Sequence, residues 1–402
     1  MAWPGEVIEE RAGDIAEAAD VLLRHQAAWR HRRMETITVL SHDQVRRHVS
    51  IDFTVPEEQR EGLRVSKEEF IVPLALLTKR ALVHFDLRNE EQHSIPLLTA
   101  DQHRTIAREL LYRQLDSDLA DQEVGDDSLV LAAGELIEAV LADEPQELEA
   151  EIGALEAAHR VELADFRASA SVLSRYFILW AIVRGLDRRR VFKFAGDEPV
   201  GRTSFVYAIG ASGCTEAESY HVEVAVPADL KARHTRLVDR ATHRPLAAGK
   251  RDTDRPALYY RAEAPLPAAP VILIEFAAER WRFLGPAALV ATIIALLIAP
   301  PFLFSDLTAL PDSAGAAVGL VLSTSAVFSA LVLRTDEHPL LRLMLFRARS
   351  LLAASTVAAL FAAASIGFRT TDWIIEGTWA LAALGSVLTA GILIVEASRA
   401  PR

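Results

Sequence analysis

The C-terminal part of the chain contains four long apolar segments, and the first of them, Phe283–Phe304, reads FLGPAALVATIIALLIAPPFLF. The others are Ser313–Leu333, Ser350–Phe368 and Thr378–Val395, and none of the four contains a charged residue. About 20 helical residues cross the hydrocarbon core of a bilayer, which is about 30 Å thick. Buried helices of soluble proteins usually keep a polar face, which these segments lack. We therefore predict an all-α four-helix transmembrane bundle over residues 283–396.

Charge is distributed unevenly along the 402 residues. The chain has 55 Asp and Glu against 43 Lys and Arg, but residues 281–402 contain eight Arg and seven acidic residues. The excess negative charge therefore lies before the apolar segments. Non-specific binding to nucleic acid depends on Lys and Arg that neutralise phosphates, so we expect no nucleic-acid partner. The single cysteine, Cys214, excludes an intrachain disulfide and a cysteine-rich zinc site.

Basic residues flank the apolar segments unequally. Successive loops between the four segments would lie on opposite sides of the membrane. On one side the only basic residue is Arg369. The other side, with both chain ends, has eight basic residues, namely Arg280, Arg282, Arg334, Arg342, Arg347, Arg349, Arg399 and Arg402. Lys and Arg concentrate in the cytoplasmic loops of membrane proteins. The residues Met1–Glu6 also lack the basic and apolar segments of a signal peptide. We therefore predict that both termini and residues 1–280 are cytoplasmic, with the lipid bilayer as a partner.

Alternating apolar and polar residues predict β-strands before the membrane segments. The clearest run places Val49, Ile51, Phe53 and Val55 on one face and ends at Pro56. Further strands are predicted near residues 70–77, 83–87, 191–194, 220–226, 257–260 and 271–276. The periodicity is helical over Glu9–Arg33, and again after Thr99 and Gln102, which form a capping box.

Strands on both sides of one helical block predict an α+β soluble domain, β-sandwich-like, with a helical insertion at about residues 99–186. The segment Asp116–Asp165 within the insertion is strongly acidic. Its acidic helices are either a solvated hairpin or a docking surface for a basic protein partner.

We interpret Ala168–Leu186 as the last helix of this insertion. Its Tyr176–Val183 core is apolar, but Arg175 argues against a membrane span. The helix either packs on the sheet or lies on the inner leaflet of the membrane. In the second case a basic cluster would face anionic lipid, and this cluster comprises Arg184, Arg188, Arg189, Arg190 and Lys193.

No pattern in the chain indicates catalysis, a cofactor or a metal. The pairs His84–Asp86 and His221–Glu223 each share one strand face, so they could join an enzyme site assembled by the fold. Exposed polar pairs on strands are far more common. We find no phosphate-binding loop, nucleophile elbow or zinc-binding His-Glu-x-x-His motif.

Small residues recur at four-residue spacing in the apolar segments, most clearly Gly315, Gly319 and Ser323. Such rows allow helices to approach closely. They indicate packing within the bundle or, alternatively, formation of a homo-oligomer.

The strand Ser219–Val224 and its Val226-Pro227 end, before a short C-terminal bundle, resemble uncharacterised integral membrane proteins of high-GC bacteria. The resemblance implies a bacterial plasma membrane location and no functional residues. Our leading hypothesis is a membrane-anchored binding or signalling module. The alternative is a channel or transporter component with a cytosolic regulatory domain.

Overall fold

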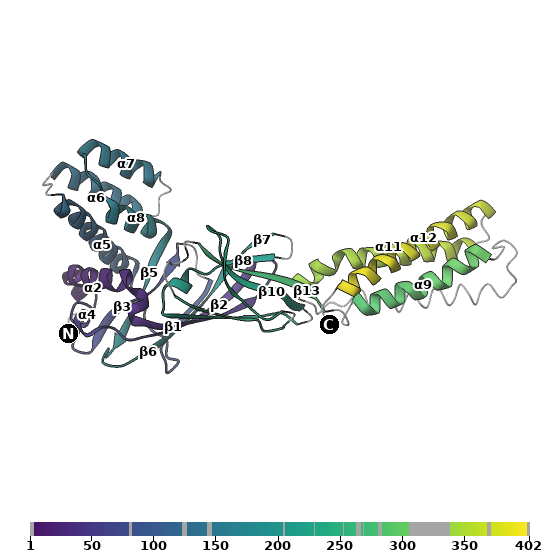
Figure 1. The fold of residues 1–402 in the computed structure, drawn as a ribbon, viewed down its shortest axis with the longest axis horizontal. Helices are drawn as coiled ribbons and strands as arrows, with labels where there is room; N and C mark the ends of the chain where they lie inside the picture. Colours follow the sequence, from purple (N-terminus) through teal and green to yellow (C-terminus); the bar gives the residue numbers. More distant parts are fainter. Residues whose placement is uncertain are drawn as a thin grey trace.

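In the computed structural model, a lobe of helices, a β-rich region and a group of apolar helices follow one another along the longest axis (Figure 1). The structure describes residues 4–79, 83–122, 127–142, 147–203, 206–228, 230–251, 253–262, 267, 269–279, 284–304, 338–367 and 371–399. The predicted order, a β-rich N-terminal region followed by a helical C-terminal part, is confirmed.

Six strands form the larger sheet, and the strand near its centre is β1, Arg30–Val39. Across the sheet the strands are β12 (Ala257–Arg261), β9 (Ser219–Ala225), β1, β2 (Gln44–Phe53), β6 (Arg190–Pro199) and β4 (Val83–Arg88). β1 pairs in parallel with β9 and antiparallel with β2. Strand β1 therefore joins a segment near residue 30 to one near residue 220.

A second sheet of five strands lies against part of the larger sheet. Its strands in order are β11 (Arg244–Ala248), β10 (Leu230–Asp239), β13 (Pro270–Ala278), β8 (Val206–Gly210) and β7 (Gly201–Thr203). One buried apolar cluster contains Ile37 and Tyr220 from the larger sheet and Tyr207 and Ile274 from the smaller one. The two sheets thus share a core.

The third sheet is a two-stranded ribbon of β3 (Glu69–Thr78) and β5 (Tyr176–Arg184). One face of the ribbon packs on the larger sheet, where Leu179 and Phe53 belong to one cluster. The other face, with Ile178 and Trp180, packs against the helical lobe. Both faces are buried, which explains the continuous apolar sequence of β5. The predicted helix over Ala168–Leu186 is therefore wrong after Arg175, and no inner-leaflet helix forms there.

Four helices of the lobe lie between β4 and β5 in the sequence: α5 (Ala100–Asp121), α6 (Asp127–Leu141), α7 (Leu148–His159) and α8 (Ala164–Arg175). The predicted capping box begins α5, where Thr99 accepts from the Gln102 amide and Gln102 accepts from the Thr99 amide.

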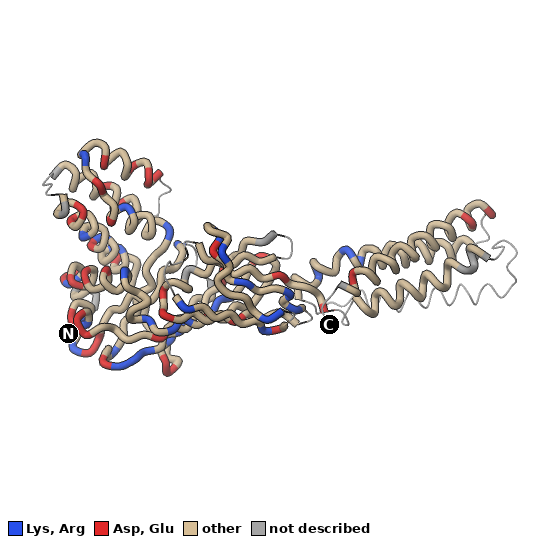
Figure 2. The backbone as a smooth tube through the Cα atoms, viewed as in Figure 1, with Lys and Arg blue, Asp and Glu red and all other residues tan. Residues whose placement is uncertain are grey.

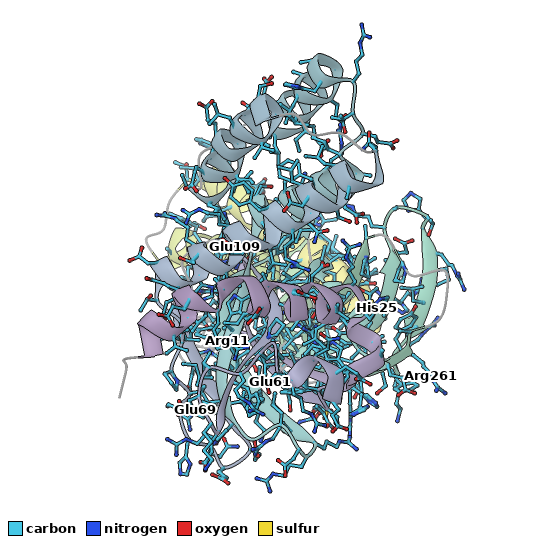
Figure 3. The ribbon with its side chains drawn as sticks, turned by 90° about the vertical axis from the view of Figure 1, so that its left-hand side faces the viewer. Arg11, His25, Glu61, Glu69, Glu109 and Arg261 are labelled. Atoms are coloured by element: carbon cyan, nitrogen blue, oxygen red, sulfur yellow. The ribbon has the colours of Figure 1, made fainter. Side chains whose placement is uncertain are left out.

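Four short or medium helices come from elsewhere in the N-terminal region: α1 (Pro4–Glu10), α2 (Ala12–Arg24), α3 (Gln26–Trp29) and α4 (Glu57–Arg60). α2 lies alongside α5, and Arg11 at its start donates to the Glu61 carbonyl oxygen at 3.0 Å (Figure 3). The predicted helix over Glu9–Arg33 ends at Trp29, because β1 begins at Arg30.

Three C-terminal helices are described: α9 (Gly285–Phe304), α11 (Pro339–Gly367) and α12 (Asp372–Arg399). By length and composition, two helical segments, Pro339–Ser365 and Asp372–Ser398, could cross a membrane. Figure 2 shows that charged residues are sparse along these helices and lie towards their ends. The predicted segment Ser313–Leu333, with Gly315, Gly319 and Ser323, lies outside the described residues.

Small and hydroxyl-bearing side chains fill the contacts between these helices. The Ser355 and Ser386 hydroxyl oxygens are 3.1 Å apart, and the Trp379 indole N–H donates to the Ala362 carbonyl oxygen at 2.9 Å. Large apolar side chains point outward, and Phe361 and Leu381 are 66% and 70% exposed. This distribution is typical of helices packed in lipid rather than in water.

The position of β13 predicts where the β-rich region ends. β13 pairs with β10 on one side and β8 on the other, so its removal would expose two strand edges and part of the shared core. We expect a chain truncated after Ala278 to fold and unfold cooperatively in urea. A chain truncated after Ala269 should aggregate or unfold at much lower urea concentration. Equal unfolding midpoints for the two would contradict this role of β13.

Candidate functional site

The four arginines of the predicted basic cluster pair with carboxylates, while Lys193 is exposed on β6. Arg189 binds the Asp52 carboxylate through two hydrogen bonds, Arg190 binds Glu90, and Arg184 Nε lies 3.5 Å from Glu69 Oε1. Arg190 lies opposite Phe53 on β2, at the end of the sheet far from α11. This placement favours the interpretation that the cluster is structural rather than lipid-facing.

The two histidine pairs are not brought together. His84 lies on the edge strand β4, where its Nδ1 is 2.7 Å from Asp197 Oδ2, whereas His221 lies on β9 near the opposite edge. Within the described ranges, no three His, Cys, Asp or Glu side chains form a group that could hold a metal ion. The structure therefore does not bring the two histidine pairs together into one site.

Several carboxylates of the acidic segment Asp116–Asp165 form ion pairs inside the lobe. Arg108 on α5 binds Glu138 on α6, while Arg167 on α8 binds Glu149 and Glu156 on α7. These pairs connect successive helices of the lobe. Whether the remaining carboxylates bind a protein partner stays a prediction.

The structure buries a group of charged side chains that the sequence analysis did not single out. We call it the charge cluster, and it consists of Arg30, Arg33, Glu35, Arg47 and Glu216. Glu35 accepts from Arg33 at 2.7 Å, from Arg47 at 2.6 Å and from the Tyr220 hydroxyl at 2.9 Å. Glu216 accepts from Arg33 at 2.5 Å and from Arg30 at 3.4 Å.

The charge cluster joins all three sheets. Arg33 and Glu35 extend from β1 and Arg47 from β2, all in the larger sheet. Arg30 donates to the Pro73 carbonyl oxygen of the ribbon at 2.9 Å, and Arg47 donates to the Gly210 carbonyl oxygen of the smaller sheet at 2.8 Å. A side chain at Gly213 would overlap the Arg33 guanidinium, so a larger residue there would displace Arg33.

Burial and charge pairing shift the pKa values of this cluster in opposite directions. Burial alone would raise the pKa of Glu35, but Arg47 and Arg33 outweigh it and leave that pKa below its usual range. Burial lowers the pKa of Arg30 to about 10 against the attraction of Glu216. Burial also raises the pKa of Cys214 to about 12, so its thiol is protonated at neutral pH and is a poor nucleophile.

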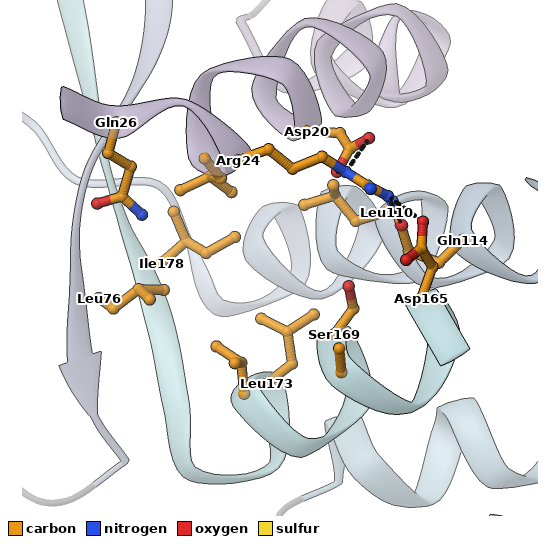
Figure 4. Close-up of a pocket in the computed structure, with 13 residues that line it drawn as sticks. Asp20, Arg24, Gln26, Leu76, Leu110, Gln114, Asp165, Ser169, Leu173 and Ile178 are labelled. Carbon is orange, nitrogen blue, oxygen red and sulfur yellow. Dashed lines mark hydrogen bonds and ion pairs between the residues drawn. The ribbon is translucent and has the colours of Figure 1, made fainter. Parts of the chain in front are cut away.

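Three cavities surround the connection between α8 and β5. The junction cavity, about 310 Å³, lies between α2, α5, α8 and β5 (Figure 4). Its walls are apolar, with Leu110, Leu173 and Ile178. Its rim is polar, because Arg24 binds Asp20, Asp165 and Gln114 there.

A neighbouring space of about 560 Å³, the Glu216 cavity, shares Arg24 and Gln26 with the junction cavity and reaches Glu216. The basic cavity, about 530 Å³, lies on another side of the same connection and shares Leu173 and Ile178 with the junction cavity. Cavities of this size with apolar walls and a few polar groups are typical of small-molecule sites.

A chain of contacts leads from these cavities to the apolar helices. Gln26 lines two of the cavities and accepts a hydrogen bond from Arg30, the first residue of β1, at 2.5 Å. The last residue of β1, Val39, accepts a hydrogen bond from His338 Nε2 at 3.1 Å. His338 Nδ1 accepts from the Leu340 amide, so the same ring also caps the start of α11.

No protein-family model and no curated protein matches the chain. The geometry itself therefore provides the functional argument. The site combines three cavities with a buried charge cluster, and the strand that carries part of this cluster ends beside an apolar helix.

The charge cluster predicts acid sensitivity that depends on Glu35. The Glu35 pKa is lower in the folded chain than the value of about 4.3 in an unfolded one. The contribution of ionised Glu35 to the free energy of unfolding is therefore fully present above that pH. It is lost as the pH falls through the folded-state pKa. We expect Glu35→Gln to lower the free energy of unfolding by about 3 kcal/mol at neutral pH, because two buried arginines lose a charged partner.

Urea unfolding of the detergent-solubilised chain between about pH 3 and pH 7 measures both effects. The dependence of stability on pH should be flatter in Glu35→Gln than in the native protein. Glu58→Gln, at an exposed position on α4, provides the matched control and should change little. Equal stability of Glu35→Gln and the native chain would show that the cluster does not support the fold.

Proposed function

We propose that the chain is a multi-pass membrane protein of the bacterial plasma membrane, in which a cytosolic binding module passes its state to membrane helices. The outward apolar faces and inward hydroxyl groups of α11 and α12 support membrane insertion. Arg342, Arg347 and Arg349 lie in the first turns of α11, next to the β-rich region. Basic residues at that end favour a cytoplasmic location for it.

The observation that carries the proposal is the pair of contacts at the two ends of β1. A ligand in the junction or Glu216 cavity would touch Gln26, and Gln26 is hydrogen-bonded to Arg30. The strand covers ten residues, about 30 Å, and ends at the carbonyl group that binds His338.

Strand β1 is well suited to transmit a small displacement. It is paired along its length with β2 and β9, and its buried side chains are fixed by charged hydrogen bonds. The register with β2 shifts between Arg30 and Arg32 and is regular from Arg32 to Val39, and close packing of this kind transmits strain. In the proposed mechanism, ligand contact shifts Arg30, and the strand then changes how His338 holds the start of α11.

The orientation is testable with reporter fusions. Enzyme reporters that are active only in the cytoplasm or only in the periplasm, fused before Ala2 and after Arg402, should both give the cytoplasmic result. A periplasmic result at either end would exclude this topology.

The proposed relay along β1 predicts that a substitution at Gln26 changes the amide exchange of α11. We expect Gln26→Ala to accelerate amide hydrogen–deuterium exchange in the first turns of α11, measured on the full chain in lipid nanodiscs. His338→Asn should have the same effect, because asparagine can still cap the helix but is too short to reach Val39.

Gln122→Ala is the matched control for this experiment. Gln122 also forms side-chain hydrogen bonds, but to Asp118 and Glu162 within the lobe, away from β1. If Gln26→Ala and Gln122→Ala leave α11 equally protected, the proposed relay is wrong.

A further inference from the structure

The basic cavity differs from the other two in the charge of its walls. Its polar side chains come from Lys79 at the end of β3 and from His103 and Arg104 in the first turns of α5. No described residue that lines it carries a carboxylate. By contrast, the junction cavity contains Asp20 and Asp165, and the Glu216 cavity contains Glu216.

The remaining walls of the basic cavity are aromatic or aliphatic. They are formed by Leu98, Leu141, Leu173, Tyr176, Phe177, Ile178 and Trp180. Trp180 and Ile178 are almost fully buried, so the floor of the cavity is fixed by the packing of the ribbon against the lobe. A rigid apolar floor with polar groups on one side suits an amphipathic small molecule.

The cation best placed to bind an anion is Arg104. It is exposed and forms no ion pair with another residue in the described part of the chain. Glu138 attracts Arg104 electrostatically, but its carboxylate is bound by Arg108 through two hydrogen bonds. A guanidinium group with free donors binds a carboxylate through two parallel hydrogen bonds.

His103 supplies a second, uncharged donor. Its ring packs edge-on against Phe177, with the ring centres 6.0 Å apart. Burial lowers the pKa of His103 to about 4, so the ring is neutral at pH 7 and offers one N–H group. The ammonium group of Lys79 donates to the Val140 carbonyl oxygen at 3.0 Å, so we assign the anion to Arg104 and His103. One cation and one neutral donor match the single charge of a carboxylate better than the greater charge of a phosphate.

We propose that the basic cavity binds a small organic carboxylate with an aromatic body, its charged end at Arg104 and His103 and its ring against Phe177 and Ile178. This inference rests on the proposed function, since it names the ligand class of the binding module. A ligand there would contact Tyr176 and Leu173, which also line the other cavities, so it would act on the connection between α8 and β5.

Two probes of the same shape test the proposal: 2-naphthoate, which is an anion, and 2-naphthamide, which is neutral. Their binding to the full chain in lipid nanodiscs is measured by calorimetry, with empty nanodiscs to correct for partition into lipid. We expect 2-naphthoate to bind at least about tenfold more tightly than 2-naphthamide, because only the anion forms charged hydrogen bonds.

Variants on α5 locate the binding site. Arg104→Gln should weaken 2-naphthoate at least about tenfold and leave 2-naphthamide almost unchanged. Arg113 is a half-buried arginine on the same helix that pairs with Glu17, and Arg113→Gln is the control that should bind both probes normally. Ala107→Leu narrows the cavity without changing charge, so it should weaken both probes.

Equal binding of the two probes, or unchanged 2-naphthoate affinity in Arg104→Gln, would overturn the proposal, and so would the absence of 2-naphthoate binding at millimolar concentration. A different result would bear on the proposed function instead. If 2-naphthoate binds as expected but α11 exchanges at the same rate with and without it, the carboxylate site stands and coupling from the basic cavity to α11 fails, whereas the relay from Gln26 is tested by Gln26→Ala.

Discussion

The arrangement of the β-rich region depends on the charge cluster around Glu35. Three arginines and two glutamates are removed from water there, and the desolvation of each ion costs several kcal/mol. Only close pairing offsets that cost, and some of these contacts join segments that are distant in sequence: Arg33 binds Glu216, and Arg47 binds the Gly210 carbonyl oxygen. The position of the three sheets relative to one another is therefore coupled to a few hydrogen bonds.

An apolar core could fill the same space, and such replacements in other proteins are often neutral or stabilising. What an apolar core would lack is the directional link from Gln26 through Arg30 to β1. We interpret the buried charged side chains as the connection through which a ligand in the cavities would displace β1. The apolar clusters on either side of the charge cluster supply the bulk of the hydrophobic stabilisation.

Alternating residues predicted β2 and β9, and a nearly all-apolar run predicted β13; the structure has strands at all three places. The predicted helix Glu9–Arg33 covered the first four residues of β1, and the rest of the strand was not predicted, because its inward positions include Arg33 and Glu35, which break the apolar alternation. The run of β-branched residues at Thr36–Val39 was the available signal for a strand. β5 was assigned to a helix because both of its faces are buried, which removes the alternation altogether.

The cavities could not have been predicted from the sequence. Their walls come from α2, α5, α8 and the ribbon, and no local pattern tells which faces of these elements meet. The same limit applies to His338, which lies about 300 residues after the strand end that it contacts. What the sequence did indicate correctly is that apolar helices follow a β-rich region.

The coupling free energy between Gln26 and His338 tests the central claim most directly. It is obtained from the unfolding free energies of Gln26→Ala, His338→Asn and the double variant, measured on the β-rich region of the detergent-solubilised chain. Distant sites without shared partners add to within about 0.5 kcal/mol. Transmission along β1 predicts a departure from additivity of about 1 kcal/mol or more. Strict additivity would show that the two ends of the strand are independent and would contradict the account.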